Sequence, residues 1–109
     1  MAGKGIHTYS VQESQNAGLG QAGSVYLNNA GTTFTPTNGV IVAISVLEDD
    51  TAFDTLTAED STKYMSYGAT GYESGGNAIS TNTFPQGSVL FGRWTSISLS
   101  AGKVIAYIG

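Results

Sequence analysis

The closing segment of the chain, residues 84–109, constrains the fold more than any other part of the sequence. Within it, Ile97 and Leu99 alternate with serines, which is the pattern of a strand with one buried face. A second alternating run begins at Val104, and Gly102 between the two runs can adopt the positive φ that a tight turn requires. The segment therefore predicts a closing β-hairpin.

Short apolar runs separated by glycine, proline and asparagine recur along the rest of the chain, and none keeps a 3.6-residue period. Residues 40–47 are apolar on both faces, which predicts a central strand covered on both sides. We expect an all-β fold, a small antiparallel β-sandwich or flattened barrel of about seven short strands. Further strands are expected at residues 24–28, 32–35, 63–67 and 78–84, and a loop with one helical turn at residues 48–60.

The first part of the chain differs in composition from the rest. Residues 14–23 are rich in glycine and amides and offer little apolar surface, so we expect residues 1–23 to form an extended N-terminal arm. The Gly-x-Gly-x-x-Gly spacing at residues 18–23 has no strand before it and no helix pattern after it, which does not fit a phosphate-binding loop. Residues 24–109 are expected to form the β domain.

The charge pattern excludes several classes of partner. Charged residues make up only 11% of the chain, against roughly 25% in an average domain, and the net charge is −4. The basic residues are scattered, whereas a nucleic-acid surface needs clustered cations. No apolar run approaches the ~18 residues of a membrane span, and the first residues lack the apolar region of a signal peptide. The basic residues are Lys4, Lys63, Arg93 and Lys103.

Catalytic and metal-binding patterns are also missing from the sequence. The chain has no cysteine, and its single histidine, His7, lies in the expected arm. The acids of residues 48–60 do not have the spacing of an EF-hand loop, so we interpret them as a solvated loop. We therefore expect no enzymatic activity and no cofactor. Those acids are Glu48, Asp49, Asp50, Asp54, Glu59 and Asp60.

The Arg93-Trp94 pair is the candidate for interaction. Strand alternation places Phe91, Arg93 and Ile97 on one face and Leu90 and Trp94 on the other. We expect Trp94, the only tryptophan, to lie in the core. Arg93 is either a rim charge that pairs with a carboxylate or a contact residue of a protein interface, where arginine is enriched.

Several motifs resemble one family of proteins. They are Phe-Thr-Pro at 34–36, Val-Ile-Val-Ala-Ile at 40–44, Phe-Asp-Thr-Leu at 53–56, Phe-Pro-Gln-Gly at 84–87, Phe-Gly-Arg-Trp-Thr at 91–95 and Ile-Ala-Tyr-Ile-Gly at 105–109. Together they resemble small structural proteins of tailed phages of marine bacteria and cyanobacteria, of the capsid decoration or knob type. The resemblance spans roughly residues 32–109, and residues 92–95 with the closing motif are its most specific part.

The resemblance implies a non-enzymatic capsid decoration protein that binds the outside of the assembled head. Its partner would be the major capsid protein, its location the capsid surface of the virion, and its place of assembly the host cytoplasm. A homo-oligomer, with a trimer favoured, would suit a small domain that has no disulfide, and the arm would reach across to neighbouring subunits.

Two alternative functions remain open at this point. A tail-fibre or adhesin module would bind host glycans through tyrosines that stack on sugars, with Tyr64, Tyr67 and Tyr72 as the candidates. A small hydrolase would use the acids of residues 48–60, although the sequence offers no sign of a saccharide cleft.

Overall fold

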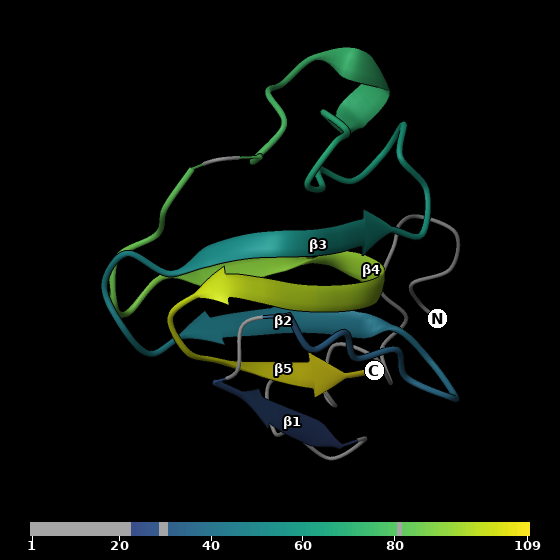
Figure 1. Ribbon diagram of the computed structural model, residues 1–109. Helices are drawn as coiled ribbons and strands as arrows, with labels where there is room; N and C mark the ends of the chain where they lie inside the picture. Colours follow the sequence, from purple (N-terminus) through teal and green to yellow (C-terminus); the bar gives the residue numbers. More distant parts are fainter. Residues whose placement is uncertain (1–22, 29–30, 81) are drawn as a thin grey trace.

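The computed structural model describes residues 23–28, 31–80 and 82–109 (Figure 1). Except for Gly23, the expected arm lies outside these described residues, together with His7 and most of the Gly-x-Gly-x-x-Gly run. The account of the fold below therefore concerns the β domain alone.

The described chain forms one antiparallel sheet of five strands, so the prediction of an all-β fold is confirmed. The strand order is β1-β5-β2-β4-β3. The only helical element among residues 23–28, 31–80 and 82–109 is a single 3-10 turn, η1. The elements are β1 (Ser24–Leu27), β2 (Ile41–Val46), β3 (Ala52–Ala58), η1 (Tyr72–Ser74), β4 (Val89–Ala101) and β5 (Val104–Ile108).

The sandwich and the count of seven strands are not confirmed, because three segments expected as strands do not join the sheet as strands. Residues 32–35 and 78–84 touch other strands only through the isolated bridges Phe34–Ile97 and Thr51–Phe84. Residues 63–67 make only the local bridge Met65–Thr70. Each segment is short and has a glycine or proline directly beside it, Gly31 and Pro36, Gly68, or Pro85, which limits the length of a ladder.

β2 is the central strand, as the sequence predicts, and five of its six residues are buried. Its alternation is interrupted by a register shift between Ile41 and Ala43. Such a shift adds a residue to one strand and turns the following side chains to the other face. Ile41, Ile44 and Val46 therefore face the core together, although Ile41 and Ile44 lie three positions apart.

β4 changes partner halfway along its length. Its first half, up to Trp94, pairs with β2, and its second half, from Trp94 to Ala101, pairs with β3. The ribbon of β4 bends sharply between these halves in Figure 1. β5 then pairs with β2 and β1 and has no ladder with β4, so the expected closing hairpin is wrong although its two strands and its turn at Gly102 exist.

The core fills the inside of this bent sheet. Trp94, Ile97, Leu99 and Val104 are fully buried there. A long excursion between β3 and β4, residues 59–88, covers the core in place of a second sheet (Figure 1). The excursion contributes Ile79, Met65, Tyr67 and Phe84. The Phe84 ring packs edge to face against the ring of Phe53 in β3, with the ring centroids 5.7 Å apart.

β3 occupies residues that the sequence assigned to an acidic loop with a helical turn. That prediction is wrong for Ala52–Ala58, which form a strand. Register shifts interrupt the ladder between β3 and β4, so the buried side chains of β3 do not alternate with exposed ones. Phe53 and Leu56 both face the core although they lie three positions apart. Without a two-residue period, the sequence carries no strand signal there.

Trp94 holds the inside of the β4 bend. Its side chain is fully buried, and its indole N–H donates a hydrogen bond of 2.9 Å to the carbonyl oxygen of Met65 in the excursion. The ring lies against the backbone of Gly92, where an added Cβ would come within 2.7 Å of the indole Cζ2. Only glycine leaves room for the ring at this position.

We predict that Gly92→Ala destabilises the domain by about 1–3 kcal/mol, because the methyl group forces the indole away from its site. Gly68→Ala is the matched control, since a Cβ at Gly68 meets no atom within 4 Å. Urea unfolding followed by tryptophan fluorescence measures both variants. Equal stability of the two would contradict the packing described for Trp94.

Candidate interaction surface

The face of the sheet that is turned away from the core carries two rows of cross-strand neighbours. One row runs from Phe91 of β4 through Ala43 of β2 to Tyr107 of β5, and then to Ser24 of β1. The other row runs across the same strands as Val89, Ser45, Ile105 and Tyr26. Because side chains directly opposite each other in antiparallel strands are neighbours, the two rows form one continuous surface.

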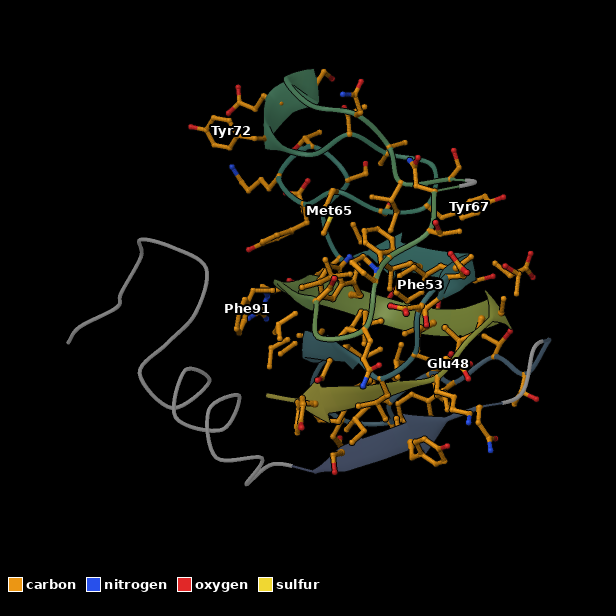
Figure 2. All side chains as sticks on the ribbon, turned by 90° about the vertical axis from the view of Figure 1, so that its left-hand side faces the viewer. Glu48, Phe53, Met65, Tyr67, Tyr72 and Phe91 are labelled. Carbon is orange, nitrogen blue, oxygen red and sulfur yellow. The ribbon has the colours of Figure 1, made fainter. Side chains whose placement is uncertain are left out.

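Five large side chains dominate this surface, which we name the outer-face patch. Phe91 is 64% exposed, Tyr26 52% and Val89 49%. Ile105 and Tyr107 between them are half-buried, and no residue of the five is charged. Phe91, labelled in Figure 2, is exposed, whereas Phe53 is buried in the core. The patch comprises Tyr26, Val89, Phe91, Ile105 and Tyr107.

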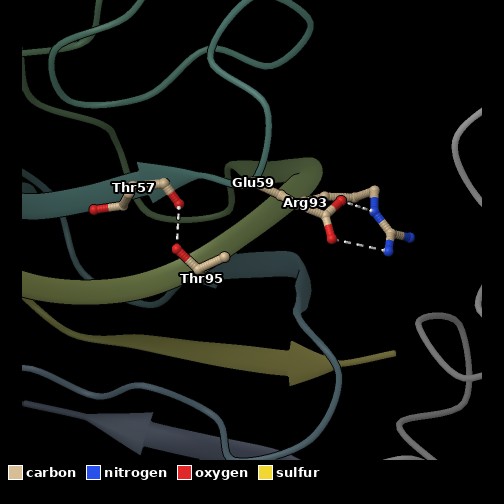
Figure 3. A network of polar contacts seen from close by, with 4 residues as sticks. All are labelled: Thr57, Glu59, Arg93 and Thr95. Atoms are coloured by element: carbon tan, nitrogen blue, oxygen red, sulfur yellow. Dashed lines mark hydrogen bonds and ion pairs between the residues drawn. The ribbon is translucent and has the colours of Figure 1, made fainter.

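Arg93 follows Phe91 on the same face of β4, at the bend of the strand. Its Nε donates to Oε1 of Glu59 at 2.6 Å, and Nη2 donates to Oε2 at 3.4 Å (Figure 3). The Arg93 side chain is 17% exposed and that of Glu59 is 40% exposed. The backbone joins the same residues, because the Glu59 amide donates to the Arg93 carbonyl at 2.9 Å. The expectation that Arg93 pairs with a carboxylate is confirmed.

Hydroxyl groups hold the strands together beside this ion pair. The Thr95 hydroxyl donates to the Thr57 carbonyl at 3.4 Å (Figure 3), and the Ser96 hydroxyl donates to the Thr57 hydroxyl at 3.0 Å. These contacts connect β3 to β4 where β4 bends. The outside of the bend is therefore polar, while its inside is filled by the Trp94 ring.

The three candidate tyrosines lie in the excursion but do not form one exposed aromatic surface. Tyr72 on η1 is 76% exposed. Tyr67 is half-buried and packs against the core, and Tyr64 is also half-buried. In Figure 2, Tyr72 and Tyr67 lie on opposite sides of the excursion. Only Tyr72 presents most of its ring for stacking.

The acids of residues 48–60 are spread over several structural roles. The Asp49 carboxylate accepts a hydrogen bond of 2.8 Å from the backbone amide of Gln86, and the Glu48 carboxylate lies 3.7 Å from the Lys103 ammonium group. Glu59 pairs with Arg93, and Asp54 is exposed on β3. Among the described residues, no three acidic or histidine side chains are grouped closely enough to hold a metal ion.

One hollow opens beside the segment that leads into β2. It has a volume of about 320 Å³ and is lined by uncharged residues only, so its walls offer no acid, base or charged ligand for chemistry. No helix in the described residues is long and apolar enough to cross a membrane. The lining residues are Phe34, Thr35, Pro36, Thr37, Asn38 and Ile108.

Sequence reasoning found the neighbourhood of the surface at Arg93 but missed the patch itself. The available signal was that β4 is apolar on both faces between Val89 and Trp94, with Phe91 opposite the Trp94 face. The other contributors, Tyr26 and Tyr107, come from strands far away in the sequence. Their place beside Phe91 follows only from the strand order.

Comparison with known proteins gives no relative. No protein-family model, no curated protein and no solved structure matches the chain. The functional argument therefore depends on the residues and on their geometry.

Asp60 provides a test of the turn that begins the excursion. Its carboxylate accepts hydrogen bonds from the Thr62 hydroxyl at 2.6 Å and from the Thr62 amide at 3.0 Å, and these bonds lower the pKa of Asp60 below its usual value of 3.8. A lowered folded-state pKa contributes stability that is complete above the usual pKa and is lost as the pH falls through the folded value.

We predict that Thr62→Val raises the pKa of Asp60 toward its usual value, because the side-chain hydrogen bond is the largest cause of the shift. An NMR titration of the Asp60 side-chain carboxyl carbon measures the change. Thr62→Ser, which keeps the hydroxyl, should leave the pKa low. A pKa that is equal in the valine and serine variants would refute this assignment.

Proposed function

We propose that this chain is a non-enzymatic structural protein of a phage virion, a capsid decoration protein that binds the outside of the assembled head. The observation that carries the proposal is the outer-face patch. Exposed apolar surfaces that are continuous over several strands mark protein-binding sites on soluble domains. Phe91 and the two tyrosines of the patch belong to the aromatic residues that are enriched in the buried centres of interfaces.

The partner in this proposal is the major capsid protein. A small patch gives weak binding for one copy, but a lattice offers many equivalent sites, and an oligomeric ligand binds several of them at once. The proposal therefore includes the homo-oligomer, with a trimer favoured, and the attachment of residues 1–23 to neighbouring subunits. Arg93 lies beside Phe91 at the end of the patch and supplies a polar contact at its rim.

Two features of the chain support this assignment. The motif at residues 92–95, which is the most specific part of the resemblance to decoration proteins, forms the bend of β4 beside the patch. We also propose that the domain is a flattened barrel, as expected from the sequence. The Phe34–Ile97 bridge supports it, since it brings a further segment against the second half of β4.

A tail-fibre or adhesin module that binds host glycans is the second candidate. The observation in its favour is Tyr72, which is 76% exposed on η1. Sugar-binding sites use exposed aromatic rings for stacking. This function depends on the excursion, whereas capsid binding depends on the sheet, so single substitutions separate the two.

We predict that Phe91→Ser lowers the affinity for mature heads of the phage that encodes the chain by at least about tenfold, the loss expected for an interface hot spot. Co-sedimentation of the purified protein with heads that lack it measures occupancy. Tyr72→Ser is the matched control, because it also removes an exposed aromatic ring but lies outside the patch.

The outcomes distinguish the two functions. Loss of head binding in Phe91→Ser alone supports decoration through the patch. If wild-type protein does not sediment with heads but binds a glycan array, and Tyr72→Ser abolishes that binding, the glycan function replaces the proposal. Circular dichroism of both variants confirms that each is folded.

A further inference from the structure

The outer edge of β1 presents a row of backbone groups to solvent. β1 ends the sheet, with β5 on its inner side. The Ile108 amide donates to the Gly23 carbonyl at 2.8 Å, so Gly23 and Ile108 are a hydrogen-bonded pair. Such pairs alternate along an antiparallel ladder. The N–H and C=O groups of Ser24 and Tyr26 therefore point away from β5, and no described residue pairs with them.

The opposite edge of the sheet is protected. β3 has three register shifts, which distort an edge and hinder further pairing. Asp54 places a charge in the middle of β3, and the Leu56 carbonyl accepts a hydrogen bond from the Tyr67 amide of the excursion. Edge charges, bulges and covering loops are the devices by which proteins prevent unwanted strand pairing.

Within the part of the chain that the structure describes, β1 has none of these devices. Residues 23–28 contain no charge and no proline, and the β1 ladder has a regular register throughout. In a chain with a net charge of −4, this is an edge that a second copy could approach without meeting a like charge along the seam. Natural edge strands that are left open in this way are templates for pairing.

We propose that two copies of this chain pair antiparallel through β1, about a two-fold axis at Tyr26. In this register Tyr26 lies opposite Tyr26 of the second copy, and Ser24 lies opposite Asn28. The outward-pointing backbone groups then meet as hydrogen-bonded pairs. In this arrangement, opposite residues of the two copies point to the same face of the joined sheet. Val25 of one copy therefore lies beside Leu27 of the other on the core side.

The seam joins the outer-face patches of both copies, because Tyr26 belongs to the patch and to the edge. Strand pairing over five residues buries less surface than the ~800 Å² per partner of a standard stable interface. The dimer is therefore weak and depends on concentration. A two-fold contact through β1 is distinct from the three-fold contact of a trimer. The inference does not depend on what the patch binds.

Cysteine cross-linking tests the register directly, because the chain has no native cysteine. Opposite residues of a hydrogen-bonded pair have Cα atoms about 5.5 Å apart, which is within the range of a disulfide. We predict that Tyr26→Cys forms a disulfide dimer at least about tenfold faster than Thr57→Cys, which places an exposed cysteine on β3 at the opposite edge.

Proline substitutions then test the backbone pairing. Ser24→Pro, made in the Tyr26→Cys protein, removes an amide that points outward and leaves the β5 ladder intact, since proline is tolerated where the N–H faces solvent. Cross-linking should fall to the rate of Thr57→Cys. Phe91→Ser, made in the Tyr26→Cys protein without the proline, should leave the cross-linking rate unchanged. This result separates pairing through β1 from association through the patch.

Other occupants of the edge give different results. Equal cross-linking rates for Tyr26→Cys and Thr57→Cys would overturn the proposal. If cross-linking at Tyr26 becomes fast only after deletion of residues 2–20, the edge is covered by that segment in the intact protein and the proposal is equally wrong. Sedimentation velocity on the cysteine-free protein checks that a reversible dimer forms as the concentration rises.

Discussion

The bend of β4 is the constraint on which the rest of the structure depends. A straight strand of thirteen residues would extend beyond β2, whereas the bent strand pairs with β2 and then with β3. On its inside, the Trp94 ring fills the space over Gly92 and binds the Met65 carbonyl. On its outside, the Arg93–Glu59 ion pair ties β4 to the end of β3. Burial stabilises the inside, while the partly exposed ion pair mainly fixes the geometry of the outside.

The same bend explains why a chain of this size needs no second sheet. Because β4 turns over the core, one sheet supplies two sides of it, and the excursion supplies the remaining cover through Ile79, Met65 and Phe84. The arrangement leaves the first half of β4 with no cover on its outer face from any described strand. Phe91 and Val89 are exposed for that reason, so the packing that completes the core also creates the apolar surface.

The sequence predicted the parts of this fold that depend on local pattern. The all-β class, the central β2, the buried Trp94 and the existence of β5 as a strand all follow from alternation and composition. The bulges were not predictable, because an extra residue in a strand leaves no signature in the sequence. The bulges hid β3 from the sequence analysis and changed which side chains of β2 face the core. The closing hairpin was wrong because a turn at Gly102 fixes where the chain reverses, but not which strand it then joins.

The patch and the open edge have a common origin in the position of β1. As the last strand of the sheet, β1 has one free edge, and its outward alternation places Tyr26 on the face of Phe91. A contact at either surface therefore bears on the other. Pairing of two edges would fix two patches in one plane at a set spacing, and a rigid pair of weak sites binds a periodic surface more strongly than two independent sites. If both proposals hold, self-association and binding to a lattice are two uses of one strand.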